Sequence, residues 1–326
     1  MRGNISAGVL LRVNRWVLTG AILTATFAVL VGFSQLGLTP LRTIVDDQDG
    51  LHFLFSAFIG AIITGTSIVV TINQLVLSQE LGAVGDQRDR MEASMAFRQD
   101  IESKTQQGTS PPEPAAFLYE LVDGIERRAI ELRETVADGG SEGEVAIIEY
   151  VDDLVENAQS VKGNLENAQF GNFEVVQAAL QFNYSRKIYD AHQIQSDYTD
   201  SLSSETIEAI DGTVELLTLF APAREHFKTL YFQWELINLS RALLYLAVPT
   251  LTTMGLLIMY IDGNALPGAT FGVDNLVWLT SAGFVIGLSP FVVFIAYVLR
   301  IVTVAKQTLA MGPFILRESE RESDPG

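Results

Sequence analysis

The sequence of 326 residues contains no cysteine and only 5 lysines against 16 arginines. The absence of cysteine excludes a disulfide-stabilised scaffold, thiol catalysis and cysteine metal clusters. Apolar residues nevertheless make up 48% of the chain and charged residues only 18%. The chain therefore has too much apolar surface to be disordered as a whole.

Basic residues are scarce in one part of the chain. The net charge is −18, and residues 78–240 hold 30 Asp and Glu against 12 Lys and Arg, whereas the remainder holds 9 of each. An acidic, lysine-poor domain is typical of a salt-rich cytoplasm, where net charge maintains solubility and salt screens self-repulsion. This composition predicts a halophilic archaeal origin; an ordinary acidic domain is the alternative.

Four stretches lack Asp, Glu, Lys and Arg altogether, at residues 16–36, 51–77, 242–261 and 276–299. Each is long enough to cross a hydrocarbon core of about 30 Å, and helices of a soluble core seldom lack a charged face over such a length. The sequence predicts an all-α protein with four membrane spans. Its parts are an N-terminal membrane hairpin (1–77), an acidic helical domain (78–240), a C-terminal membrane hairpin (241–305) and a tail (306–326).

The arginines predict how these spans are oriented. The loop 262–275 has no Lys or Arg, and the loop 37–50 has only Arg42. Basic residues instead lie before the first span and after the fourth, at Arg2, Arg12, Arg15, Arg300, Lys306, Arg317 and Arg321. The positive-inside rule then places both termini and the acidic domain in the cytoplasm of a multi-pass cell-membrane protein. The first span is expected to be an uncleaved anchor, because no small-x-small cleavage site follows it.

The acidic domain has the periodicity of a helical bundle. Apolar residues recur every three or four positions over residues 117–136, 148–165, 173–184 and 207–217. Gly, Pro, Ser and Asn separate these runs at residues 108–112, 138–141, 171–172 and 201–204. We expect a bundle of about four to six helices.

Two helices are expected to continue from a span into this domain. No strong breaker lies between Leu51 and Lys104, although Gly82 and Gly85 weaken the continuity. Residues 223–261 contain only one breaker, Pro249, which is expected to kink the third span.

Small and polar residues follow one face of the second span. At about 100° per residue they fall within an arc of roughly 80°. They are Ser56, Gly60, Thr64, Ser67, Thr71, Gln74 and Ser78. One interpretation is close packing against another helix, since small and hydroxylated residues dominate such interfaces. The other is a wall facing water or ions, where these oxygens replace hydration. In a symmetric ring with this span innermost, both would hold.

The fourth span carries Gly283 and Gly287 at GxxxG spacing, followed by Pro290. The two glycines permit close approach of a second helix, and Pro290 is expected to bend the span.

Motifs for chemistry are absent from the sequence. It contains no phosphate-binding loop, dinucleotide fingerprint, HExxH or GxSxG, and His52, His192 and His226 lie far apart. The spans carry no central ionisable residue for a proton relay or voltage sensor. We expect no enzyme activity, cofactor, metal site or nucleic-acid partner.

The layout of two spans, a large helical cytoplasmic insert and two more spans resembles bestrophin-type anion channels and the flagellar stator subunit that conducts protons. No motif is shared, so no site residue carries over. The first hypothesis is a homo-oligomeric, channel-like protein in the lipid bilayer, with the acidic bundle as vestibule or gate. The second is a membrane-anchored scaffold or signalling component whose bundle docks a cytoplasmic partner, and the third is a subunit of a transport or secretion assembly.

Overall fold

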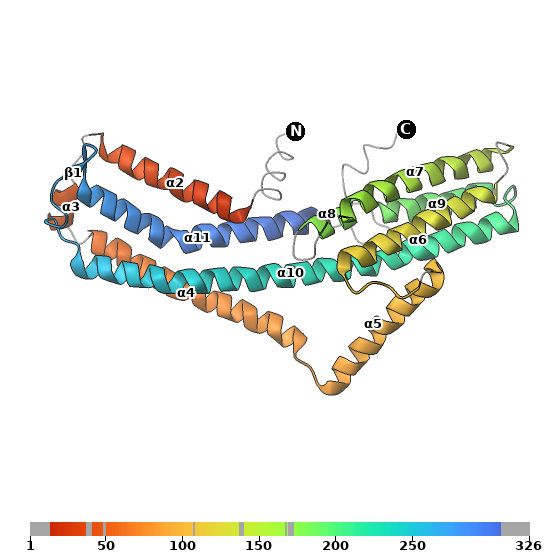
Figure 1. Ribbon diagram of the computed structural model, residues 1–326, viewed down its shortest axis with the longest axis horizontal. Coiled ribbons are helices and arrows are strands. Elements are labelled where there is room, and N and C mark those ends of the chain that lie inside the picture. Colours follow the sequence, from red (N-terminus) through yellow and green to blue (C-terminus); the bar gives the residue numbers. More distant parts are fainter. Residues whose placement is uncertain are drawn as a thin grey trace. The chain divides into compact units, whose positions relative to one another are not determined.

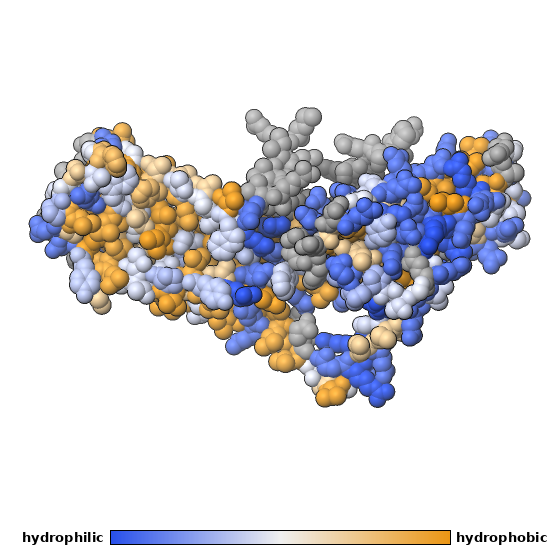
Figure 2. Space-filling view, viewed as in Figure 1, coloured by the Kyte–Doolittle hydropathy of each residue, from blue (hydrophilic) through white to orange (hydrophobic). Residues whose placement is uncertain are grey.

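The computed structural model describes residues 14–36, 41–47, 50–106, 108–136, 140–166, 168 and 173–307. In these ranges the regular secondary structure is helical except for one short hairpin (Figure 1). It divides into two compact units, residues 1–81 with 233–304 and residues 82–232 with 305–326. We call the first the apolar unit and the second the acidic unit. Figure 2 shows their different surfaces: hydrophobic side chains crowd the helices of the apolar unit, and hydrophilic ones cover the bundle of the acidic unit.

The apolar unit contains four helices that are long and apolar enough to cross a membrane. They are α2 (Arg15–Ser34), α4 (Gly50–Glu80), the later part of α10 (Ser204–Tyr260) and α11 (Asn275–Gln307). The prediction of an all-α chain with four stretches of spanning length is therefore confirmed. The short helix α3 (Leu41–Asp47) precedes α4. The predicted orientation rests partly on residues outside the described ranges, namely Arg2, Arg12, Arg317 and Arg321. The tail from residue 308 onwards also lies outside them.

Helices α4, α10 and α11 share the core of the apolar unit. One buried cluster includes Val69, Leu243 and Val293, and another includes Phe55 and Met254. Helix α2 adds an aromatic contact, with the ring centroids of Phe27 and Trp278 5.7 Å apart. Large apolar side chains on facing stripes thus fix the rotation of each helix about its axis.

The predicted continuity of the second span is wrong. Helix α4 ends at Glu80, and α5 (Val84–Thr105) begins after a three-residue break that contains Gly82. Ala83 is the extended N-cap of α5, with φ −62° and ψ 155°. A glycine in a helix interior costs about 1 kcal/mol of stability relative to alanine. The helix therefore ends near Gly82, where its stability is lowered.

The third span does continue into the acidic unit. Helix α10 runs unbroken for 57 residues and includes both Pro222 and Pro249. Each proline removes one backbone donor, and α10 is nevertheless continuous through both positions.

The acidic unit is built from α5, α6 (Pro114–Glu134), α7 (Glu142–Leu165), α8 (Phe173–Gln181), α9 (Tyr184–Tyr198) and the first part of α10. One hydrophobic core joins them, with Leu121, Leu154 and Leu217 fully buried. A capping box starts α7, because the Ser141 hydroxyl accepts from the backbone N–H of Glu144 while the Glu144 carboxylate accepts from that of Ser141. The single helix expected over residues 173–184 is divided at residues 182–183.

A two-stranded hairpin in the loop between α10 and α11 was not predicted. Strand β1 (Ala269–Thr270) pairs antiparallel with β2 (Val273–Asp274). The turn residues Phe271 and Gly272 both have positive φ, 55° and 79°, as the tightest hairpin turns require.

Candidate functional site: the exposed face of α4 and the cavity beside it

Every member of the polar row on α4 is exposed. We call Ser56, Gly60, Thr64, Ser67, Thr71, Gln74 and Ser78 the hydroxyl stripe. On the opposite side of the helix, Phe55, Ile62 and Val69 are 0%, 3% and 2% exposed. In the described part of the chain, α4 thus packs its apolar face against the other helices of the apolar unit. Among the described residues, the other helices of the apolar unit leave the hydroxyl stripe exposed, although Thr64 also lines a cavity shared with α10 and α11.

The hydroxyl groups of the stripe bond to their own helix. Thr64 Oγ1 donates to the Gly60 carbonyl at 2.9 Å, Ser67 Oγ to that of Ile63 at 2.9 Å, and Thr71 Oγ1 to that of Ser67 at 3.0 Å. This back-bonding pairs each of these hydroxyl donors with a carbonyl of its own helix. The oxygen lone pairs remain on an outward-facing surface as acceptors.

Asn73, also polar, lies on a different face of α4. Ser240 Oγ of α10 donates to its Oδ1 at 2.7 Å, and Ser240 is buried. Asn73 thus takes part in a hydrogen bond between helices of the apolar unit and lies apart from the exposed hydroxyl stripe.

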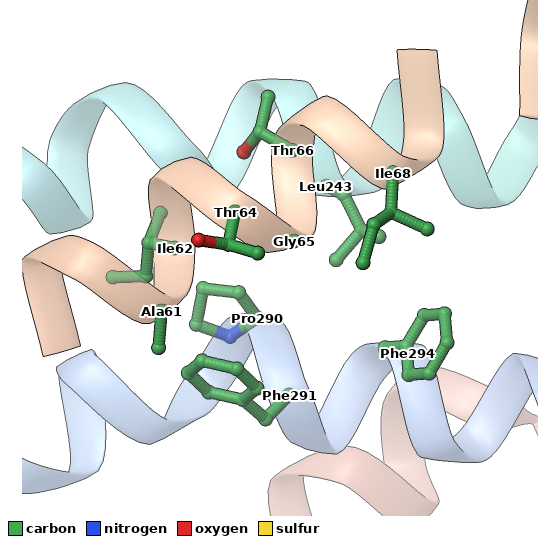
Figure 3. Close-up of a pocket in the computed structure, with 10 residues that line it drawn as sticks. All are labelled: Ala61, Ile62, Thr64, Gly65, Thr66, Ile68, Leu243, Pro290, Phe291 and Phe294. Atoms are coloured by element: carbon green, nitrogen blue, oxygen red, sulfur yellow. The ribbon is translucent and has the colours of Figure 1, made fainter. Parts of the chain in front are cut away.

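A cavity of about 390 Å³ adjoins the stripe between α4, α10 and α11. Figure 3 shows the rings of Pro290 and Phe294 projecting from α11 towards Thr64 and Ile68 of α4. Pro290 lies inside α11 and cannot donate to the Ile286 carbonyl. Ser289 Oγ donates to that carbonyl instead, at 2.8 Å.

Gly283 and Gly287 lie where α11 contacts its neighbours. A Cβ at Gly283 would be 2.4 Å from Leu257 Cδ1 of α10, and one at Gly287 would be 2.9 Å from Phe58 Cδ2 of α4. The GxxxG pair thus permits close packing between helices of the apolar unit.

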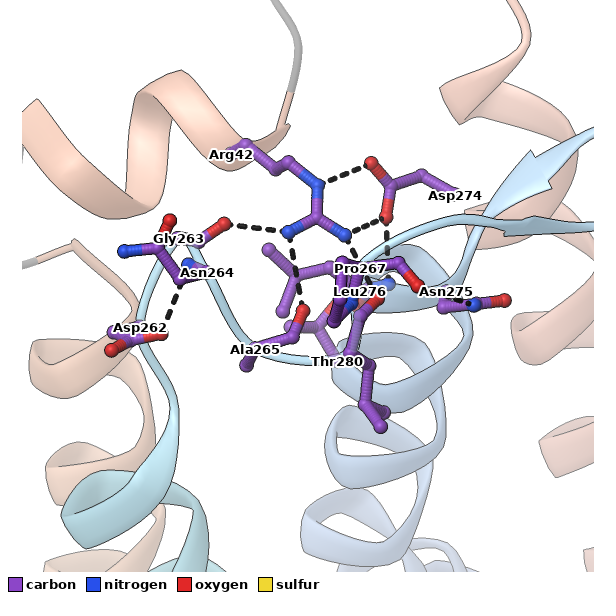
Figure 4. A network of polar contacts seen from close by, with 11 residues as sticks. Arg42, Asp262, Gly263, Asn264, Ala265, Pro267, Asp274, Asn275, Leu276 and Thr280 are labelled. Atoms are coloured by element: carbon purple, nitrogen blue, oxygen red, sulfur yellow. Dashed lines mark hydrogen bonds and ion pairs between the residues drawn. The ribbon is translucent and has the colours of Figure 1, made fainter.

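Arg42 of α3 binds the loop between α10 and α11 (Figure 4). Its Nε and Nη2 each donate to one carboxylate oxygen of Asp274 at 2.7 Å, and it also donates to the carbonyls of Gly263, Ala265 and Leu266. The hydrogen bonds from the guanidinium hold the pKa of Asp274 below its usual value. Asp274 Oδ1 also accepts from the N–H of Leu276 at 2.8 Å and so caps α11.

A second ion pair joins α2 to α10. Arg15 Nη2 donates to Glu235 Oε1 at 3.1 Å, and its Nη1 contacts the other carboxylate oxygen. The Glu235 side chain is 1% exposed. The Arg15 guanidinium also lies 4.4 Å from the ring centroid of Tyr297 on α11. This one side chain of α2 therefore contacts residues of both α10 and α11.

These sites can be set beside known families. A family described as "Family of unknown function (DUF7972)" matches residues 2–325. The chain belongs to this family. No curated protein and no solved structure matches it. Membership of DUF7972 therefore brings no activity to the sites described above.

Sequence reasoning found the hydroxyl stripe but missed the two ion pairs. Both join residues more than 200 positions apart, so no local spacing could reveal them. The only signal in the sequence was the arginine itself, which was assigned to membrane orientation at both positions. Among the residues that the structure describes, no group of three His, Asp or Glu side chains is arranged to hold a metal ion.

Proposed function

We propose that the protein is a homo-oligomeric, channel-like protein of the cell membrane in which α4 faces a common axis. The observation that carries the proposal is that every residue of the hydroxyl stripe is exposed, opposite a buried apolar face of the same helix. A hydroxylated surface gains nothing from contact with lipid tails. It gains from a second helix or from water.

The borders of the stripe support the same arrangement. Exposed apolar side chains flank it, with Ile63, Val70 and Leu77 on one side and Ile68 and Leu75 on the other. Neighbouring copies can pack through these borders, while the hydroxyl and amide oxygens between them face the axis. The stripe carries no ionisable group, so hydroxyl and amide dipoles would replace the hydration of a permeating solute.

Ser67→Leu tests this proposal. Ser67 lies near the middle of α4, and a leucine there should narrow and dewet a conduit while leaving assembly largely intact. We expect conductance in planar bilayers to fall by at least about tenfold, the effect of roughly 1.4 kcal/mol on a permeation barrier. Val70→Leu, about 60° away on the same helix, adds apolar volume outside the stripe and is the control.

Two results would contradict the proposal. One is an unchanged conductance in Ser67→Leu, which would mean that the stripe does not line the pathway. The other is a monomeric wild-type protein in detergent, because the protomer alone has no axis for α4 to surround.

The proposed orientation places both termini and the acidic unit in the cytoplasm and the loop between α10 and α11 outside. Asn264 and Thr109 are both exposed, and the native chain has no cysteine to give a background. Asn264→Cys is expected to react with a membrane-impermeant thiol reagent in intact cells, whereas Thr109→Cys should react only after lysis. The reverse labelling pattern would show that the protein has the opposite orientation in the membrane.

A membrane-anchored scaffold is the second candidate, and α5 is the observation that favours it. Residues 81–96 are all exposed wherever the structure describes them, including Leu81, Val84, Met91 and Met95. Val84, Met91 and Met95 share one face at helical spacing, as expected of a docking helix. A protein that is monomeric in detergent and shows no ion conductance in planar bilayers would favour this second function. Neither candidate requires the protein to be an enzyme.

A further inference from the structure

The cavity beside the hydroxyl stripe has the size and the walls of a small-molecule site. Its walls come from α4, α10 and α11, with Gly65, Thr66, Leu243 and Phe291 among the lining residues (Figure 3). Its volume of about 390 Å³ lies within the range of small-molecule sites, about 300–1,000 Å³.

Two small residues on α4 keep this space open. Gly65 has no side chain, and nothing lies within 4 Å of the position that a Cβ would take. Ala61, one helical turn earlier, also lines the cavity. Across from them, Pro290 presents a compact ring, and the carbonyl that it leaves without a backbone donor is bonded by Ser289. No exposed backbone acceptor therefore has to be matched by an occupant at this position.

The lining determines the chemistry of the occupant. It includes no Asp, Glu, Lys, Arg or His, and its polar side chains are the hydroxyls of Thr64 and Thr66. Thr64 already donates to its own helix. A water molecule needs two to four polar partners to be held, so apolar cavities of this kind stay dry. An empty cavity forfeits the dispersion contacts of its walls, so a hydrocarbon chain is the occupant that gains most.

The depth of the cavity identifies the source of that hydrocarbon. Residues 61–68 lie in the middle of the α4 span Gly50–Ser78, and residues 290–294 lie in the middle of the α11 span Asn275–Ala305. A bilayer around these spans places lipid chains at the same depth. We propose that this cavity binds one hydrocarbon chain of a membrane lipid. The proposal requires that the spans cross a bilayer but does not depend on conduction.

Photo-crosslinking tests the site in the full-length protein. The probe is a phosphatidylcholine with a diazirine in the middle of one chain, reconstituted with the protein in vesicles. After irradiation, mass spectrometry should find labelled peptides at Ile68 and Phe294 more often than at Val29, an exposed residue of α2.

Filling the cavity is expected to remove this labelling. Gly65→Leu should lower it about tenfold at Phe294, because the leucine replaces roughly two buried methylene groups of the lipid chain. Gly20→Leu is the matched control, since Gly20 also has nothing within 4 Å of a Cβ but does not line the cavity. If Gly65→Leu does not fold, Ala61→Leu fills the same space from the next helical turn.

Two outcomes would overturn the proposal. Labelling at Phe294 no stronger than at Val29 would show that no lipid chain is held there. Labelling that persists in both cavity-filling variants while oligomers dissociate would show that the cavity receives a side chain of a second copy. The second result would leave the proposed channel intact, so the two proposals fail separately.

Discussion

Replacing Glu235 with alanine is expected to destabilise the apolar unit by about 3 kcal/mol, the lower end of the cost of breaking a buried ion pair. Glu235 is 1% exposed and its partner Arg15 is 20% exposed. Without the carboxylate, the guanidinium remains against the Tyr297 ring in a partly buried place. The cost falls at the lower end because Arg15 keeps some contact with solvent. The melting temperature of the purified protein in detergent should fall by about 5–10 °C.

A double variant separates loss of the pair from loss of packing. Arg15→Met combined with Glu235→Leu removes both charges and keeps apolar volume, so it should recover most of the lost stability. Glu92→Ala provides the exposed control: its pair with Arg88 leaves the two side chains 60% and 77% exposed. Its loss should therefore have little effect. If the double variant is as unstable as Glu235→Ala, the ion pair is not the cause.

Gly287→Leu is expected to have the second large effect, a loss of about 3 kcal/mol from overpacking. Its Cβ would lie 2.9 Å from Phe58 Cδ2 and 3.2 Å from Met254 Sδ. The Phe58 ring packs edge-on against Phe284, with centroids 5.4 Å apart, and has little room to retreat. We expect broadened elution on size-exclusion chromatography and a lower melting temperature.

Substitutions at two other glycines serve as controls for this prediction. Gly20→Leu places the same side chain where nothing lies within 4 Å of the new Cβ, and its stability should match the wild type. Gly283→Ala should cost less than Gly287→Leu, because its Cβ meets Leu257 Cδ1, the movable end of a flexible side chain. A Gly287→Leu protein as stable as Gly20→Leu would contradict close packing at this contact.

The contact at Gly287 also bears on the proposed function. Phe58 and Gly287 hold one face of α4 against α11, and this packing fixes which face of α4 is left exposed. Gly287→Leu should therefore impair conduction together with stability, whereas Ser67→Leu should impair conduction alone. Comparing the two variants distinguishes residues that hold α4 in place from residues that line the proposed conduit.

Much of the architecture is local in origin and was readable from the sequence alone. A span is a run of about 20 apolar residues, and the four runs correspond closely to α2, α4, the end of α10 and α11. The breakers at residues 108–112 and 201–204 lie between helices as expected, since Gly, Pro and Ser act on the chain within a few residues. The periodicity of the hydroxyl stripe is equally local.

Tertiary structure alone decided what that stripe faces. Periodicity places Ser56 and Thr64 on one side of a helix, but the burial of Phe55 and Val69 against α10 and α11 leaves that side exposed. The helix break at residues 81–83 was not predicted, although Gly82 was recognised as weakening the continuity, because a glycine costs a helix only about 1 kcal/mol. The continuity of the third span through Pro249 was predicted and is confirmed. The ion pairs of Arg15 and Arg42 exist because folding brings together residues more than 200 positions apart, and no local pattern records that proximity.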